Sequence, residues 1–192
     1  MRARSSIAFA MALGVAPLVA CAGTGEQGAE AAVDAGTDDG GSCAAGEMAA
    51  ILAAANQAQV DATMQIRASL SDPKAVALSE KMLTDHALVL EQLQGAERAG
   101  AIAARPGGIS RAIADSAEHD RSDIAASSSI DSAYADREVL WHMRDVALLD
   151  AVVAPAVKGT RVAFVATSMQ ELEKQHVALA QALQAELNAT CR

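Results

Sequence analysis

The sequence predicts an all-α protein, folded as an antiparallel up-down four-helix bundle, on three observations. The chain of 192 residues is 52% hydrophobic but only 2% aromatic. Its apolar residues are mostly Ala and Leu, which favour helices, whereas β-branched and aromatic residues mark strands. Four long segments carry apolar residues at steps of three or four, the spacing of a helix with one buried face.

The first 43 residues are expected to lie outside the folded domain. Residues 1–20 begin with two arginines and continue as an apolar run, the pattern of a secretory signal peptide. Residues 21–43 are mainly Gly, Ala and acidic residues, a composition that predicts a flexible acidic tether. Residues 44–192 then form one domain of ordinary size.

The apolar run ends in Leu18, Val19, Ala20 and Cys21. These residues resemble a bacterial lipobox, and the resemblance implies cleavage before Cys21 and lipidation of its sulfur and amino group. Several acyl chains hold a protein at a bilayer more firmly than one chain does. Ala22 follows, not the Asp that would suggest retention at an inner membrane. We therefore expect a lipid-anchored protein of a bacterial cell envelope, at the outer membrane facing the periplasm. An ordinary signal peptide with an incidental cysteine is the alternative.

The first helix is expected over residues 44–70, where one face is apolar except at Gln59. Its positions are Met48, Leu52, Ala55, Gln59, Ala62, Ile66 and Leu70. The next three residues separate this helix from the second. Ser71 or Asp72 can cap a helix, and Pro73 suits the first helical position.

The second helix is expected over residues 73–100, with Gly100 as its stop. Its predicted buried face holds Val76, Ser79, Leu83, His86, Leu90 and Leu93. Residues 104–110 form a connection, and the weakly periodic residues 111–126 predict a short extra helix between the second and third long helices.

The third long helix is expected over residues 131–154, ending at Pro155 and Gly159. Thr160 can cap the fourth, expected over residues 161–189. The two predicted faces hold Ala135, Val139, His142, Val146, Leu149 and Val153, and then Val162, Val165, Met169, Leu172, His176, Leu179, Leu183 and Leu187. Four such segments with mostly short connections predict the bundle.

Two cysteines flank the predicted domain. Cys43 precedes the first helix and Cys191 follows the last. In an up-down bundle these two positions lie at the same end, and an exported protein can form a disulfide. We expect a Cys43–Cys191 disulfide, with two free thiols as the alternative.

Each long helix carries a polar residue near the middle of its apolar face. These residues are Gln59, His86, His142 and His176. Because antiparallel helices of similar length align their midpoints, one polar layer is predicted across the core. Glu173 precedes His176 by three residues and Glu138 precedes His142 by four, so each carboxylate can share its histidine's face. Asp85 adjoins His86 but points about 100° around the helix.

This layer permits two interpretations. Three imidazoles with Glu173 and Glu138 could hold a transition metal such as Zn, Fe, Cu or Ni. Alternatively, the histidines could be satisfied by hydrogen bonds to Gln59 and the two glutamates. Only one Glu-x-x-His pair is present, since Leu83 stands three residues before His86. The acids missing at Leu83 and Gln59 favour the hydrogen-bonded layer.

The remaining features exclude several kinds of function. A formal charge of −9 and the near absence of aromatic residues argue against nucleic-acid binding. No phosphate-binding glycine loop or nucleophile elbow is visible. His119 has charged neighbours and is expected in solvent, and Tyr134 and Trp141 are expected to serve packing.

Four stretches are similar to a bacterial family of exported, often lipid-anchored proteins with a ferritin-like bundle and no established function. They are AAANQAQVDATMQ (53–65), MLTDHALVLEQL (82–93), AYADREVLWHMRDVALLD (133–150) and LEKQHVALAQAL (172–183). The resemblance covers about residues 46–185. It implies a ferritin-like fold and maps the family's three bundle histidines onto His86, His142 and His176. Gln59 and Trp141 stand where the family usually has acids, so a di-iron site is disfavoured.

The sequence therefore predicts a lipid-anchored helical bundle of the cell envelope, acting as a binding or structural module without a catalytic motif. The alternative is a ferritin-like metal-binding protein or metal-dependent oxidoreductase. Its ligands would be His86, His142, His176 and Glu173, with Glu138 beside them.

Overall fold

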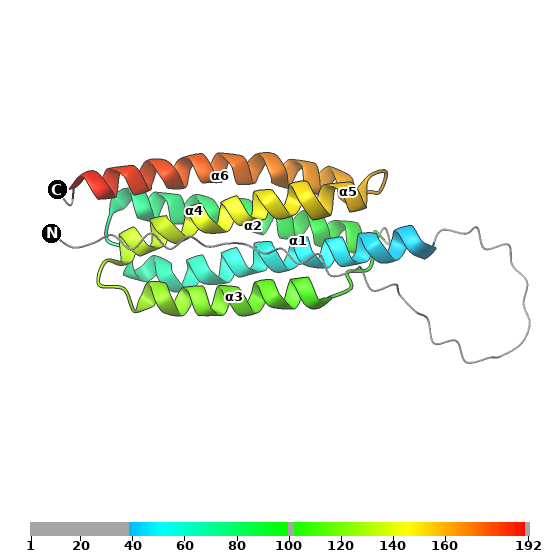
Figure 1. Cartoon of the computed structure of the whole chain (residues 1–192), viewed down its shortest axis with the longest axis horizontal. Helices are drawn as coiled ribbons and strands as arrows, with labels where there is room; N and C mark the ends of the chain where they lie inside the picture. Colours follow the sequence, from blue (N-terminus) through cyan, green and yellow to red (C-terminus); the bar gives the residue numbers. More distant parts are fainter. Residues whose placement is uncertain (1–38, 100–101, 191–192) are drawn as a thin grey trace, which may run out of the picture. The chain divides into compact units, whose positions relative to one another are not determined.

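The computed structural model describes residues 39–99 and 102–190, and every regular element in these ranges is a helix (Figure 1). The long helices are α1 (Asp39–Ile66), α2 (Pro73–Arg98), α3 (Gly108–Ala125), α4 (Ile130–Leu148) and α6 (Val162–Thr190). Three short elements join them: the 3₁₀ helix η1 (Arg67–Ser69), the π-helical η2 (Leu149–Val153) and α5 (Ala154–Val157). The all-α prediction is confirmed.

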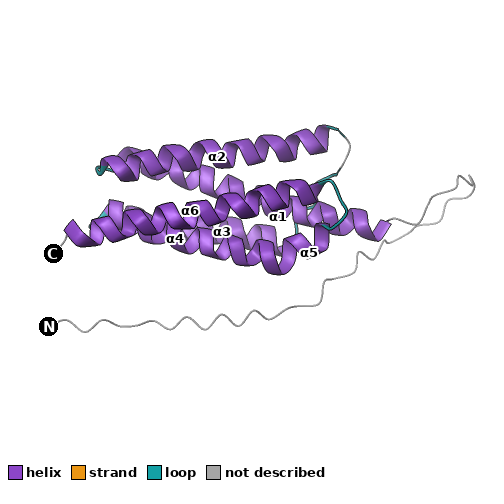
Figure 2. Cartoon of the chain, turned by 90° about the horizontal axis from the view of Figure 1, so that it is seen from above, coloured by secondary structure: helices purple, strands orange, loops and turns teal. Residues whose placement is uncertain are grey.

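The long helices lie lengthwise beside one another as a bundle (Figure 2). α1 packs against α2 and α3, α4 packs against α6, and α2 also packs against α6. Contacts between α1 and α2 run in opposite order along the two segments, since Asn56 meets His86 whereas Arg67, in η1, meets Glu80. Within the described ranges, none of the helices combines the length and apolarity needed to span a bilayer.

The core follows the predicted apolar face most closely on α1. All seven positions predicted for the first helix are buried, six of them on α1 and the seventh, Leu70, just after η1. On α2 the prediction is wrong at Val76, Leu83 and Leu90, which are half-buried, because Ala75, Met82 and Val89 take the interior places. Where both neighbouring positions are apolar, packing against the other helices decides which of them is buried.

On the last helix, α6, packing also decides which of two adjacent positions is buried, and there the buried residue is charged. Leu172 is half-buried and Leu179 is 40% exposed, whereas Glu173 is fully buried. A carboxylate enters a core only when partners compensate its charge. The burial of Glu173 in preference to Leu172 therefore points to partners for this carboxylate in the centre of the bundle.

The predicted start of α2 is confirmed at Asp72. Its carboxylate accepts hydrogen bonds from the backbone N–H groups of Lys74 and Ala75, at 2.8 and 3.2 Å. Pro73 occupies the first turn, where no N–H is required. Such a cap contributes about 1 kcal/mol. The predicted stop at Gly100 lies outside the described residues.

The end of the third long segment differs from the prediction. The helical path continues through η2 and α5 to Val157 and does not stop at Pro155. Proline lacks an N–H and crowds the carbonyl four residues earlier, and a π-helical turn relieves this conflict. Gly159 then breaks the path with a φ of 82°. The Thr160 hydroxyl donates to the Val157 carbonyl at 2.7 Å and so serves the end of α5.

The extra helix α3 begins at Gly108, earlier than predicted, and is attached to α4 by polar contacts. The Trp141 indole N–H donates to Asp120 at 2.6 Å, and the Arg137 guanidinium pairs with the same carboxylate at 2.5 Å. Trp141 is 3% exposed, so its predicted packing role is confirmed. The side chain of His119 is 80% exposed, as predicted.

Several predictions fall on residues that the structure does not describe. The signal peptide, Cys21, Cys191 and the side chain of Cys43 all lie outside the described part, and so does the predicted disulfide. The predicted tether, residues 21–43, overlaps the described chain only at its end. There α1 begins at Asp39, so residues 39–43 are helical.

Candidate metal centre

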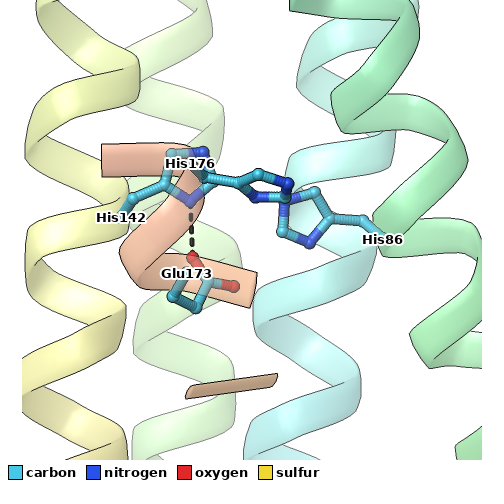
Figure 3. A group of neighbouring side chains, drawn as sticks. All are labelled: His86, His142, Glu173 and His176. Carbon is cyan, nitrogen blue, oxygen red and sulfur yellow. Dashed lines mark hydrogen bonds and ion pairs between the residues drawn. The ribbon is translucent and has the colours of Figure 1, made fainter. Parts of the chain in front are cut away.

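Three histidines from three helices meet in the centre of the bundle (Figure 3). His86 comes from α2, His142 from α4 and His176 from α6, and all three are fully buried. The ring centroid of His142 lies 5.5 Å from that of His86 and 4.8 Å from that of His176. The ring centroids of His86 and His176 are 5.1 Å apart. The predicted meeting of the three histidines is confirmed.

One nitrogen of His86 is held by α1. Its Nδ1 lies 2.9 Å from the Asn56 side-chain oxygen. The Asn56 amide nitrogen is fixed in turn, because it donates to the Leu52 carbonyl at 2.7 Å. The oxygen of Asn56 must therefore accept from an Nδ1–H of His86. Nε2 of His86 is then unprotonated, and it has no partner among the described residues.

His176 is held in the same way by an acid of α2. Its Nε2 lies 2.8 Å from the Asp85 carboxylate, which also pairs with Lys81 at 2.7 Å. Burial alone would raise the pKa of Asp85, but the bonds from Lys81 and His176 lower it below its ordinary value. The ionised acid accepts the Nε2–H, so the lone pair of His176 is on Nδ1. That atom is buried and has no described partner.

His142 lies between two buried carboxylates. Glu138 contacts its Nε2 at 2.9 Å and Glu173 contacts its Nδ1 at 2.5 Å. Burial alone would lower the pKa of His142, but the hydrogen bonds and charges of the two carboxylates raise it to about 10. His142 is therefore an imidazolium at neutral pH.

The other two imidazoles are neutral. Burial lowers the pKa of His86 well below its ordinary value, and the positive charge of His142 lowers it further. The pKa of His176 is also lowered, chiefly by burial and then by His142, although Asp85 opposes the shift. The cluster therefore combines one charged and two neutral imidazoles.

Together these side chains form a buried His/Glu cluster that could hold a metal ion. His86, His142, His176 and Glu173 each offer a ligand atom, and these atoms all lie within 4.8 Å of one another. Nitrogen ligands with one carboxylate suit Zn, Cu, Fe or Ni. Glu138 was also predicted as a ligand. It lies beside this group and contacts Nε2 of His142, the ring nitrogen that does not face Glu173.

Of two predictions about what holds the histidines, the one for Gln59 is wrong and the one for Asp85 is confirmed. Asn56 binds His86, whereas Gln59, one turn further along, is buried with both amide atoms unpartnered among the described residues. Asp85 does turn away from His86, and for that reason it reaches His176 on the neighbouring helix. The signal for Asn56 was its place in the stretch 53–65 that carries the family resemblance.

Asp145 was not predicted as part of this region. It is 1% exposed, and its carboxylate contacts Arg144 at 3.3 Å. Burial, and then the negative charge of Glu173, raise the pKa of Asp145 to about 6. Asp145 therefore adds a further negative charge near the cluster at neutral pH.

The chain was compared with protein-family models, curated proteins and solved structures, and none of them matches it. The family resemblance therefore stays a prediction.

Proposed function

We propose that this protein binds one divalent transition-metal ion at His86, His142, His176 and Glu173. The observation that supports this most directly is the state of the ring nitrogens. His86 and His176 each have one nitrogen bound to an oxygen of a neighbouring helix and one buried nitrogen with no described partner. A purely hydrogen-bonded layer would satisfy both nitrogens, whereas a metal site requires one free lone pair on each ring.

The outer partners are those that metal-binding histidines commonly have. A ligand histidine usually donates its second N–H to a carboxylate or carbonyl oxygen, which fixes the tautomer and aims the ring. Asn56 serves His86 in this way and Asp85 serves His176. Glu138 serves His142, which leaves Nδ1 of His142 and the Glu173 carboxylate facing each other.

Charge balance supports the same proposal. Glu138 and Glu173 bring two negative charges into the core, and the imidazolium of His142 compensates only one of them. A divalent ion that replaces the proton between His142 and Glu173 neutralises both. Since all four ligand residues are fully buried, the geometry favours binding of an ion over turnover of a large substrate at it.

The fold proposed for this site is an antiparallel four-helix bundle of ferritin-like type. α1, α2, α6 and the segment from α4 to α5 would form the bundle, and α3 would be an addition on α1. The opposite order of contacts supports this topology. Between α4 and α6, for example, His142 meets Glu173 whereas Asp136 meets Gln184.

Metal analysis of protein purified without a histidine tag tests the proposal. After equilibration with Zn(II), Cu(II) or anaerobic Fe(II) and removal of free ions, we expect about one equivalent of at least one metal. His86→Ala and His176→Ala should each lose that metal, since each removes a ligand. His119→Ala, which removes an exposed histidine, should retain it. Absence of stoichiometric metal with all three ions, or retention in both ligand variants, would refute the proposal.

We also propose that the protein is anchored by lipid at Cys21 in a bacterial outer membrane, facing the periplasm. The supporting observation is the sequence Leu18-Val19-Ala20-Cys21 at the end of the apolar run. In cells fed labelled palmitate, Cys21→Ser should abolish labelling of the protein. Cys43→Ser is the control and should leave it unchanged. Continued labelling of Cys21→Ser would exclude this anchor without affecting the metal proposal.

A further inference from the structure

A cavity of about 440 Å³ lies among α1, α2, α3, the start of α6 and the segment 102–106. On α1 it is lined by Ala49, Ala50, Ala53 and Ala54, and on α2 by larger side chains such as Leu90 and Leu93. The hollow follows from the sequence, because four alanines on one helix face leave space that leucines would fill. Its volume is within the usual range of small-molecule sites.

The wall formed by the segment 102–106 is attached on both sides. The Glu97 carboxylate accepts from the backbone N–H of Ala104 at 3.2 Å, and the backbone N–H of Arg105 donates to the Gly46 carbonyl at 2.9 Å. A Cβ at position 46 would lie 2.6 Å from the Ala103 carbonyl oxygen, so only glycine permits this approach. The cavity is therefore a built feature of the fold.

Most polar side chains of the lining are already used. Glu97 holds the segment 102–106, the Ser110 hydroxyl donates to the Gly107 carbonyl at 3.1 Å, and Gln57 donates to Asp61 at 2.8 Å. Gln94 and Arg111 are the exceptions, and only Arg111 carries a charge. Arg111 is exposed, and within the described part of the chain its guanidinium forms no ion pair or hydrogen bond. An unpaired guanidinium beside an apolar cavity selects for a ligand with an anionic head.

The shape of the ligand follows from the rest of the lining. The described lining is aliphatic, with Ile102, Val162 and Val165 beside the alanines and leucines, and it holds no aromatic side chain. A flexible alkyl chain fits such a surface, whereas a ring would find no stacking partner. We propose that this cavity binds a straight-chain monocarboxylate, with its alkyl chain among the alanines of α1 and its carboxylate on Arg111. This site is separate from the metal centre and does not depend on it.

Calorimetric titration with hexanoate, octanoate and decanoate, below their micelle concentrations, tests the proposal. Each added methylene that enters the cavity should tighten binding about fourfold. Decanol has the same chain without the charge and should bind about fivefold more weakly than decanoate. Binding that is not saturable, or that does not depend on chain length, would overturn the proposal.

Variants separate the two parts of the site. Arg111→Gln should weaken decanoate binding about fivefold and leave decanol unchanged, and Arg98→Gln, an exposed arginine outside the lining, should change neither. Ala53→Leu fills the cavity and should weaken both ligands at least tenfold, whereas Ala178→Leu on the exposed side of α6 should not. If Ala53→Leu does not fold, Ala114→Leu fills the cavity from α3. Unchanged binding in a folded, filled variant would also overturn the proposal.

Discussion

Replacing His142 with alanine is expected to lower the free energy of unfolding of the metal-free protein by about 3–5 kcal/mol. The histidine is fully buried between Glu138 at 2.9 Å and Glu173 at 2.5 Å, and it carries the charge that compensates theirs. Without it, two carboxylates stay in the core with no cation between them. Urea unfolding followed by circular dichroism measures the loss.

Two controls distinguish uncompensated charge from lost packing. His119→Ala removes an exposed histidine and should change stability by less than about 0.5 kcal/mol. A triple variant, Glu138→Met with His142→Leu and Glu173→Met, removes the charges together and should recover most of the stability. A loss below about 1 kcal/mol in His142→Ala, or a triple variant no more stable than it, would contradict the explanation.

The sign of the pH dependence follows from the raised pKa of His142. A group whose pKa is higher in the folded protein stabilises it fully below the unfolded value of 6.5. That contribution is lost as the pH rises through about 10, where the folded imidazolium gives up its proton. The difference in stability between the native protein and His142→Ala should therefore shrink in the alkaline range.

The bundle could be predicted from the sequence because its helices carry a regular apolar period and clear boundaries. The face from Met48 to Leu70 is broken only at Gln59, and Asp72 with Pro73 marks the start of α2. The period could not decide between adjacent apolar positions, as Leu83 and Met82 show. That choice depends on how the helices are rotated against each other, which no single helix encodes.

The candidate site, too, could be predicted from the sequence only in part. The three histidines were predictable, because each is a polar residue near the middle of an apolar face. Their oxygen partners were not, since a contact such as Asp85 to His176 depends on the offset between two helices. Gln59 was expected as the partner because it lies on the apolar face predicted for the first helix, whereas Asn56 lies one turn earlier, beside that face, and reaches His86.

Metal binding near pH 7.5 is expected to release about one proton per ion, and the affinity should rise about tenfold per pH unit between pH 7 and 9. His142 supplies this proton, because its pKa of about 10 keeps it charged until the metal takes its lone pair. His86 and His176 supply none, since the pKa of each is lowered and both are already neutral. Titration calorimetry in buffers of different ionisation enthalpy counts the protons directly.

Glu138→Gln is the informative variant for this prediction. The amide oxygen can still accept from Nε2–H of His142 and aim the ring, but the negative charge that helps to raise the pKa of His142 is gone. Fewer protons should then be released at pH 7.5, and the affinity should depend less steeply on pH. Asp115→Asn, an exposed acid of α3, should behave like the native protein. Release of no proton by the native protein would mean that the metal does not displace the proton between His142 and Glu173, and the proposed ligand set would be wrong.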